Sequence, residues 1–387
     1  MVPFLMGVLS LSYICSMHFY PSRTDLLLFE LLRVALDNEG RLTKLSVVPN
    51  DEGWNRVYAL AKSQCVRGVV YSAIKKLPEE YHPPKSLNLR WGADAEMIAS
   101  ANRMINQESA RLTNVFETAG FKTAILKGAA NARLYPNPFS RHVGDIDIWV
   151  EGGRDRIYSL LVDLNFLSEK PVENTAPHHV HLPKNKDGIT VEVHFKPAQG
   201  IPFRNRHLQA YLNQEIRNAQ RVPEGFYAPS IQFALVMQLS HLQQHALAGG
   251  LGLRQYTDYL MLLIHSTEIE REKVFSLVKS LHLKNVCGAV MWVLQEVFGL
   301  ERKWMLCAPD RSRGERLLKM ALEGGNFGKH KTVSKPRNVF VRWFKDRMRT
   351  LSWIPFDPLQ VFFMELRYWR STISLIPLRI KRRRIAL

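Results

Sequence analysis

The 387-residue chain contains few cysteines, and their spacing restricts the class of protein. Cys15, Cys65, Cys287 and Cys307 lie far apart, and no Cys-x-x-Cys pair is present. This spacing excludes a zinc ribbon and offers no disulfide framework. We therefore expect a protein of a reducing compartment, with the cytoplasm as the default.

Acidic residues are also scarce relative to basic ones. The chain has 35 aspartates and glutamates against 53 lysines and arginines, which gives a formal net charge of +18. An excess of this size favours polyanionic partners such as nucleotides, nucleic acid or an anionic membrane surface. The apolar content of 46% is ordinary, and the length is sufficient for two or three domains with a sizeable core.

The first 19 residues have no lysine, arginine, aspartate or glutamate. A signal sequence or membrane anchor would explain this, but no positive segment precedes the apolar run, and Pro3, Ser10, Ser12 and His18 dilute it. We favour an apolar extension over residues 1–22, ahead of the first domain. A buried or anchoring segment is the alternative.

Helical spacing of apolar residues predicts two helical lobes, over residues 23–119 and 229–330. In the second lobe His241 and His245 share a helix face, but the metalloprotease pattern requires Glu where Leu242 stands. Arg254 and Asp258, at positions i and i+4, predict an ion pair on the surface.

Between these lobes, residues 120–228 contain the most informative segment. Residues 144–150 alternate polar and apolar side chains, which predicts a β-strand. Period-2 geometry places Asp145 and Asp147 on one face, about 7 Å apart, and Ile146 and Ile148 on the other. Two carboxylates this close repel each other, which is unfavourable for stability but suitable for holding a divalent cation such as Mg²⁺.

A second predicted strand, residues 189–195, has Glu192 and His194 on one face. The Asn185–Gly188 segment predicts a hairpin with residues 178–182, and a two-residue turn at Asp187-Gly188 would place His181 opposite His194. Two interpretations of the histidines are open: a histidine-rich metal site, or strand histidines that satisfy their hydrogen bonds near the pocket for an anionic substrate. We favour the second.

Several motifs occur here in a fixed order. They are Leu126-Lys127-Gly128-Ala129-Ala130, Leu134-Tyr135-Pro136, Arg141-His142-Val143-Gly144-Asp145-Ile146-Asp147 and Glu192-Val193-His194. Together they resemble the nucleotidyltransferase superfamily typified by DNA polymerase β, most closely a family of bacterial nucleotidyltransferases within it. The resemblance covers residues 120–200 well and residues 230–330 loosely. It implies an α+β fold, in which a small mixed β-sheet core is flanked by N-terminal and C-terminal helical lobes.

The resemblance also implies a site and a reaction. Asp145, Asp147 and Glu192 would bind Mg²⁺, as two ions, with Mn²⁺ as an alternative. The ions would bridge the phosphates of a nucleoside triphosphate, whose nucleoside monophosphate passes to an unidentified acceptor. Glu192 would complete the second metal position or help to deprotonate the acceptor hydroxyl. The substrate-binding residues would be Lys127, Gly128, Arg141, Gly144 and His194.

These substrate-binding roles have distinct physical grounds. Gly128 lets the backbone approach the phosphates, whereas Lys127 and Arg141 can pair with phosphate oxygens. Arg141 could equally be a structural partner of Asp145 or Asp147. The superfamily commonly has Gly-Ser or Gly-Gly where this chain has Gly128-Ala129, so no hydroxyl is available to a phosphate here.

Other interpretations of the same motifs are open. One is a phosphotransferase resembling the enzymes that place phosphocholine on surface glycans, and another is a catalytically silent binding protein on the same scaffold. The resemblance also suggests that the second helical lobe covers the catalytic cleft, with His245, Arg254 or Asp258 facing the substrate.

The tail, residues 331–387, differs in character from the rest. From Val341 onward it has 11 basic and 3 acidic residues with aromatic residues between them, and these charges account for +8 of the +18. A basic aromatic helix over 358–374, followed by Lys381–Arg384, fits an anionic membrane interface or an RNA backbone. A helix that packs its aromatic side chains on the core would have the same composition. The sequence does not predict the oligomeric state.

Overall fold

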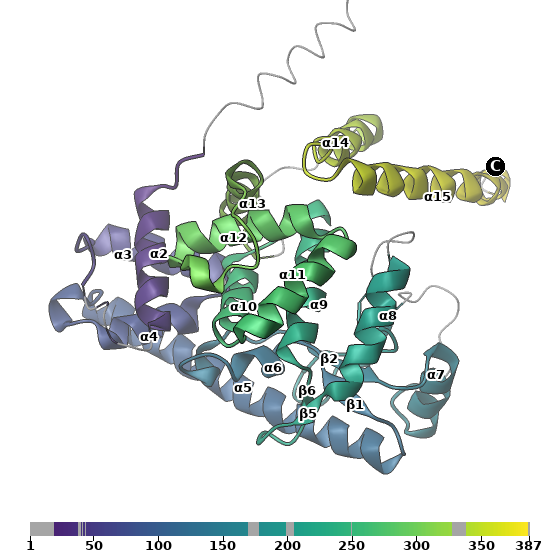
Figure 1. The fold of residues 1–387 in the computed structure, drawn as a ribbon, viewed down its shortest axis with the longest axis horizontal. Coiled ribbons are helices and arrows are strands. Elements are labelled where there is room, and N and C mark those ends of the chain that lie inside the picture. The colour runs from purple at the N-terminus through teal and green to yellow at the C-terminus, as the bar shows by residue number, and fades with distance from the viewer. Residues whose placement is uncertain are drawn as a thin grey trace, which may run out of the picture.

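The computed structural model describes residues 19–37, 40, 42, 44–168, 178–198, 205–248, 250–326 and 338–385. Most of the extension predicted for residues 1–22 lies outside the described residues. Within the described residues the chain is mainly helical, with short strands between residues 123 and 228 (Figure 1).

A four-stranded mixed sheet lies in the central region. Its strands are β1 (Thr123–Ile125), β2 (Ile146–Val150), β3 (His179–His181) and β4 (Val191–His194), in the spatial order β1-β2-β4-β3. β2 and β4 run parallel, whereas β1 is antiparallel to β2 and β3 is antiparallel to β4. With the helices around it, this sheet confirms the predicted α+β fold.

The two faces of the sheet differ in polarity. Ile146, Ile148 and Val193 pack on Phe116 of α5 (Lys85–Thr118) and Leu161 of α7 (Arg154–Asp163). Because strand side chains alternate between faces, the acidic residues at 147 and 192 project from the opposite face. The alternating strand predicted for residues 144–150 is therefore confirmed from Ile146 to Val150, and Asp145 lies just before its first residue.

The N-terminal helices are α2 (Arg23–Leu36), α3 (Asp51–Ser63), α4 (Arg67–Lys76), the 3-10 turn η1 (Glu79–Tyr81) and α5. Ser22 caps α2 through a reciprocal capping box with Asp25. α5 extends from α4 to the sheet and contacts both β1 and β2.

The C-terminal helices are α9 (Ile231–Ala248), α10 (Leu253–Ile264), α11 (Glu268–Ser280), α12 (Lys284–Phe298), η4 (Arg302–Trp304) and α13 (Arg311–Gly324). α12 packs directly against α2, so segments far apart in sequence lie side by side (Figure 1). Trp54 and Trp91 from the first lobe share a core with Phe233, Tyr256 and Tyr259 from the second. The two lobes are thus continuous in space.

Short elements complete the central region. They are α6 (Ala129–Ala132) and η2 (Pro138–Ser140) before β2, and α8 (Asn205–Glu215), η3 (Ile216–Asn218), β5 (Gln220–Arg221) and β6 (Tyr227–Ala228) after β4. α6 and η2 shape the segment that enters β2.

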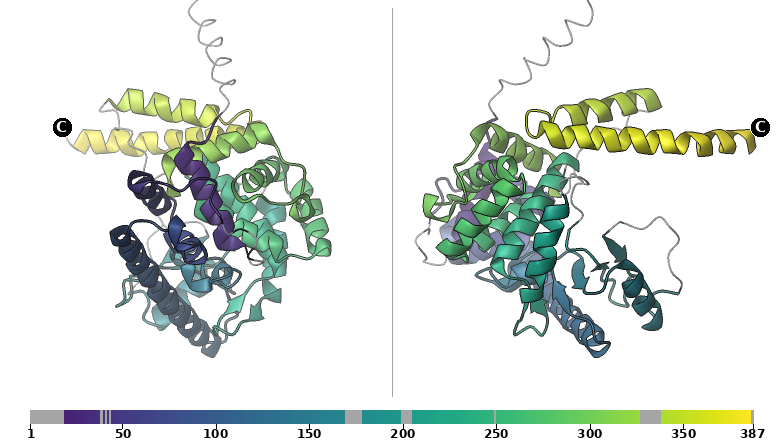
Figure 2. Two further views of the ribbon diagram at one scale, coloured as in Figure 1. Left: turned by 90° about the vertical axis from the view of Figure 1, so that its left-hand side faces the viewer. Right: turned by 45° about the vertical axis from the view of Figure 1, so that its right-hand side comes forward.

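The tail forms a helical hairpin of α14 (Val339–Leu351) and α15 (Pro358–Ile385), which projects from the body of the molecule (Figures 1 and 2). The helix predicted over 358–374 is present and continues to Ile385. Among the helices of the described residues, none has both the length and the apolar character required to cross a bilayer.

Candidate functional site

Two acidic residues face each other across the parallel strands β2 and β4. Asp147 and Glu192 are Cα partners in the register of this pair. Their carboxylates and the His194 ring offer ligand atoms that all lie within 4.8 Å of one another. Asp147 is almost fully buried, with its side chain 1% exposed. The sheet thus brings together two of the three predicted acids in a protected place.

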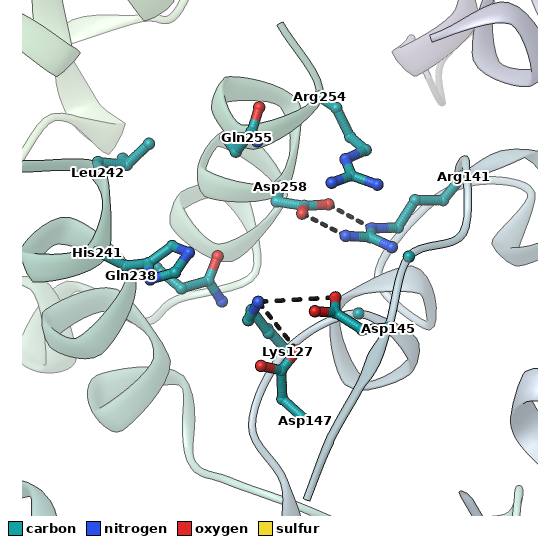
Figure 3. Close-up of a pocket in the computed structure, with 12 residues that line it drawn as sticks. Lys127, Arg141, Asp145, Asp147, Gln238, His241, Leu242, Arg254, Gln255 and Asp258 are labelled. Atoms are coloured by element: carbon teal, nitrogen blue, oxygen red, sulfur yellow. Dashed lines mark hydrogen bonds and ion pairs between the residues drawn. The ribbon is translucent and has the colours of Figure 1, made fainter. Parts of the chain in front are cut away.

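Lys127 lies between the two aspartates. The backbone bond from Leu126 N–H to the Asp147 carbonyl extends the β1–β2 pairing, so the next residue stands beside the Asp-x-Asp segment. The Lys127 Nζ atom is 2.9 Å from Asp147 Oδ2 and 4.0 Å from Asp145 Oδ1 (Figure 3). Gly128 then turns the chain into α6 with a φ of +66°, a conformation that favours glycine.

The charges of this cluster shift one another's pKa. Burial alone would raise the pKa of Asp147, but the Lys127 ammonium and the His194 hydrogen bond hold it well below its usual value. Burial, with repulsion from Asp147, raises the pKa of Asp145. Burial opposes the charge of Lys127, yet attraction to Asp147 and Asp145 leaves its pKa above the usual value. The cleft therefore holds a charged lysine between two carboxylates of unequal acidity.

His194 connects the two facing acids. Its Nε2 atom lies 3.1 Å from Asp147 Oδ1 and 3.3 Å from Glu192 Oε2. Burial would lower the pKa of His194, but hydrogen bonds to the two carboxylates raise it overall. Burial would likewise raise the pKa of Glu192, and the hydrogen bond with His194 lowers it. At neutral pH Glu192 is thus a carboxylate.

The β3–β4 hairpin has a different register from the predicted one. His181 is opposite Glu192, and His179 is opposite His194. The prediction of His181 opposite His194 was wrong because the turn is centred on Lys186-Asp187. The Asn185 side chain accepts hydrogen bonds from the N–H groups of Asp187 and Ile189, and its carbonyl accepts one from Gly188 N–H. This turn shifts the pairing by two residues and leaves the facing side chains on the same side.

Helices α9 and α10 cover the cleft. Arg254 and Asp258 of α10 line it together with Gln238 and His241 of α9 (Figure 3). Asp258 accepts two bonds of 2.7 Å from Arg141 Nε and Nη2, and both side chains are buried. The predicted surface pair of Arg254 and Asp258 was therefore wrong in its location, because both residues are buried. The positions of Arg254 and Asp258 in the lining of the cleft agree with the expectation that the second helical lobe covers it.

Arg254 lies against the segment that leads into β2. Its Nη1 atom is 3.3 Å from the carbonyls of both His142 and Val143. The same guanidinium also lies beside Gly144, since a Cβ atom there would be 3.4 Å from Arg254 Nη1, an ordinary van der Waals distance. Asn102 of α5 holds the same segment from the other side, with donor bonds from Nδ2 to the carbonyls of Phe139 (3.1 Å) and Arg141 (2.7 Å).

Three hollows meet at Asp145. The first is the cleft under α9 and α10, the second is lined by Val143, Thr190 and Asn326, and the third by Glu192, His194 and His245. Asp145 lines all three, and its side chain is 37% exposed. A reactant in any of the three hollows could reach this carboxylate.

The structure places all eight predicted site residues around the cleft and the hollow that adjoins it. Lys127, Gly128, Arg141, Gly144, Asp145 and Asp147 line the cleft, and Glu192 and His194 line the adjoining hollow. The Arg141 guanidinium, however, points to Asp258 rather than to Asp145 or Asp147. Gln238, His241 and Gln255 also line the cleft, and no local motif of the sequence marks them.

The donor set fits a hard divalent cation. Asp145, Asp147 and Glu192 offer carboxylate oxygens, the ligands that Mg²⁺ prefers, and Asp147 and Glu192 are within reach of a common ion. Asp145 is not part of that closest group, because its carboxylate faces Lys127 at the mouth of the cleft.

The mixed sheet, with its acids facing a cleft that helices cover and that holds both acidic and basic side chains, is the arrangement of a nucleotidyltransferase-like protein. The family described as "Uncharacterised nucleotidyltransferase" matches residues 50–299, and the chain belongs to this family. No curated protein matches the chain. A solved structure of an antigenic nucleotidyltransferase-like protein from Paracoccidioides brasiliensis is similar over 53% of this chain and 94% of that one, at 14% identity and a TM-score of 0.33. A similarity this remote says nothing about function.

Proposed function

We propose that the protein is a Mg²⁺-dependent nucleotidyltransferase that moves a nucleoside monophosphate from a nucleoside triphosphate to an acceptor hydroxyl. The main support is the placement of Asp147 opposite Glu192, with Asp145 and Lys127 beside them in one cleft. Family membership supports nucleotidyl transfer in general. The ion, the donor and the acceptor are our proposal.

Asp145, Asp147 and Glu192 are the residues that would hold Mg²⁺. When bound, the ion would offset the negative charge of the phosphates and of the leaving group. Asp147 is ionised well below neutral pH, so it needs no proton loss to act as a ligand.

Two cationic side chains bind the phosphates in this proposal. The Lys127 ammonium is already in the cleft, and the Arg254 guanidinium lines the same hollow from α10. Arg141 acts as a positioning residue, because both arms of its fork are engaged by Asp258. The cover of α9 and α10 limits water around the reacting phosphorus, which strengthens these interactions.

The transfer itself is a substitution at the α-phosphorus. The acceptor oxygen forms a bond to that phosphorus while the bond to the bridging oxygen breaks, and pyrophosphate leaves. The proton of the acceptor hydroxyl is lost to a carboxylate of the same cluster. Because three hollows meet at Asp145, donor and acceptor can approach this carboxylate from different sides.

The test is transfer of an α-phosphate label from each nucleoside triphosphate to a cell extract as the acceptor pool. We expect labelled product only with Mg²⁺ or Mn²⁺, and at least a hundredfold less with Asp145→Asn, since removing a charge-stabilising group commonly costs about 10²–10³ in rate. Asp155→Asn is the matched control, because this exposed aspartate of α7 lies outside the cleft. Equal labelling by wild type and Asp145→Asn would contradict the proposal.

Two other outcomes distinguish the alternative functions. Transfer from a CDP-alcohol but from no nucleoside triphosphate would indicate a phosphotransferase of the phosphocholine type. Absence of metal and nucleotide binding in calorimetry would indicate a binding protein without catalysis.

A further inference from the structure

A second group of possible metal ligands lies on the edge strand β3, beside the proposed Mg²⁺ site. His179 and His181 are at positions i and i+2, so both project from the same face of the strand. Glu192 on β4 is the register partner of His181. The ligand atoms of these three residues all lie within 4.8 Å of one another.

The distances in this group suit a single ion. The Nε2 atoms of His179 and His181 are 3.2 Å apart. With metal–nitrogen bonds of about 2.0–2.1 Å, two nitrogens on a tetrahedral ion lie roughly 3.3 Å apart. Glu192 Oε1 is 3.5 Å from His181 Nδ1, and Oε2 is 3.7 Å from His179 Nδ1, so the carboxylate is close enough to turn toward an ion held by the rings.

From this geometry we propose that His179, His181 and Glu192 bind a divalent transition-metal ion of the Zn²⁺ class. Two imidazoles and one carboxylate favour such an ion, whereas Mg²⁺ prefers oxygen ligands alone. β3 is at the edge of the sheet and the His181 side chain is 61% exposed, which provides an entry path and room for water as a further ligand. Glu192 would link this ion to the Asp147 side of the cleft.

The test uses Co²⁺ as a spectroscopic probe on the full-length, chelator-treated protein without Mg²⁺, because Glu192 also belongs to the proposed Mg²⁺ site. We expect one Co²⁺ ion to bind per chain, with a visible absorption spectrum characteristic of Co²⁺ at a low coordination number. Added Zn²⁺ should displace the Co²⁺ ion. Because loss of even an outer-shell partner weakens metal binding roughly 10–100-fold, His181→Ala should weaken it at least as much, and His179→Ala with His181→Ala should abolish the spectrum.

Controls separate this site from the proposed catalytic function. His207→Ala removes an exposed histidine of α8 and should leave Co²⁺ binding unchanged. Asp145→Asn should abolish nucleotidyl transfer while the Co²⁺ spectrum persists. An unchanged spectrum in the double variant, loss only on His178→Ala, or no Co²⁺ binding would each overturn the proposal.

An independent observation concerns the tail hairpin, which we define as α14 and α15. Eleven of the 21 large exposed apolar side chains among the described residues lie within residues 340–373. On α15 they recur as Leu359, Phe362, Leu366, Trp369 and Ile373, which follow one helix face. An apolar surface of this density on a soluble body marks an interaction site.

The hairpin is fixed to the body at its closed end. Trp353, Phe356 and Val361 are buried in the main core, and Gln243 Nε2 donates to Asp357 Oδ2 at 3.1 Å. Arg347 pairs with Glu365 at 3.0 Å and joins the two helices. The closed end is thus anchored in the body, whereas the two helices project from it (Figure 2) and carry the exposed apolar side chains.

Charge identifies the partner. Lys345, Arg349, Arg367 and Arg370 are exposed among the apolar side chains, and Lys381–Arg384 follow in the sequence. We infer that the tail hairpin lies on an anionic membrane surface, with its apolar side chains in the interface and its basic ones on lipid phosphates. An RNA partner would contact the basic side chains but leave the apolar side chains of Leu359, Leu366 and Ile373 exposed to water. A second copy of this chain would place two strongly basic tails side by side, where they would repel each other.

The test is co-sedimentation of the full chain with vesicles of phosphatidylcholine, with and without phosphatidylglycerol. We expect the chain to bind the anionic vesicles, and this binding to weaken as salt is added. A triple variant that combines Phe344→Gln, Phe362→Gln and Ile373→Gln should bind at least tenfold more weakly. These residues are exposed, so the fold should persist. Ile269→Gln, 65% exposed on α11, is the matched control.

Three outcomes would overturn this inference. They are no vesicle binding, the same binding in the triple variant, and a dimer in light scattering that the triple variant converts to a monomer. Binding to RNA that survives the triple variant while vesicle binding is absent would indicate a nucleic-acid surface instead.

Discussion

At the residue scale, the pair of Arg141 and Asp258 shows how the cleft is held together. Its two bonds of 2.7 Å are buried, and Tyr135 Oη donates a third bond to Asp258 at 2.7 Å. Burial opposes both charges, but their mutual attraction lowers the pKa of Asp258 and raises that of Arg141. The pair ties the segment before β2 to α10, so the acids and the cover of the cleft are positioned together.

Breaking this pair should be costly. Arg141→Met leaves the Asp258 charge buried without its cation, which we expect to lower the free energy of unfolding by about 3–5 kcal/mol. Arg141→Met with Asp258→Leu should recover most of that loss. Chemical denaturation measures both, with Arg56→Met in an exposed pair as the control, where we expect a change under about 1 kcal/mol. A single variant as stable as wild type would contradict the expectation.

Lys127 gives a second prediction, on metal binding. Its ammonium is 2.9 Å from Asp147 Oδ2 and competes there with any cation. Lys127→Met should therefore tighten Mn²⁺ binding in the absence of nucleotide, by about tenfold or more, which is about 1.4 kcal/mol. Nucleotidyl transfer should fall at the same time, because a phosphate-binding charge is lost. Mn²⁺ titration followed by electron paramagnetic resonance measures the affinity, and a weaker affinity would refute this role of the ammonium.

At the element scale, α5 positions the segment that enters β2. Asn102 is buried, and its Nδ2 atom donates to the carbonyls of Ile98, Phe139 and Arg141. Asn102→Leu leaves the last two carbonyls without this donor, so we expect a loss of about 1–3 kcal/mol in stability. Backbone amides of residues 139–144 should exchange faster with solvent, as followed by mass spectrometry. Asn114→Leu, at an exposed position of the same helix, should leave that exchange unchanged.

The sequence predicted those elements whose signals are local. The alternation around Asp147 and Ile148 identified β2, and the order of motifs identified the nucleotidyltransferase-like sheet. The prediction of the hairpin register was wrong because the Asn185 side chain fixes a different turn. It accepts hydrogen bonds from the N–H groups of Asp187 and Ile189, and the residue composition of the turn does not reveal these bonds. Local signals thus predicted strands and faces, but not the pairing that sets His181 opposite Glu192.

Contacts across long sequence distances could not be predicted in this way. Arg141 and Asp258 are 117 positions apart, and no periodic pattern connects them. Cys287 and Cys307 are also distant in sequence, yet their sulfur atoms lie 3.3 Å apart because α12 packs against the segment before α13. Such partners follow from packing of the two helical lobes into one core.

At the scale of the whole molecule, both helical lobes share one hydrophobic core that also includes Leu126 and Trp149 of the central region, so acid should destabilise them together. Burial, which disfavours the charged ring, lowers the pKa of His142 and of His245 to about 4, from a usual 6.5. Between these values the unfolded chain binds protons that the folded chain does not. Stability is therefore present above pH 6.5 and is lost as the pH falls toward about 4.

Each of these histidines should contribute a slope of up to about 1.4 kcal/mol per pH unit to the free energy of unfolding. His194, whose pKa is raised, acts above this range: below about pH 6.5 its ring is protonated in both states, and its stabilising contribution is lost only as the pH rises further. Denaturation at a series of pH values measures the slope, which His142→Gln and His245→Gln should each make shallower. His282→Gln is the control, because this histidine is exposed at the end of α11. A slope that is unchanged in both variants would show that these two histidines can take up protons within the folded protein.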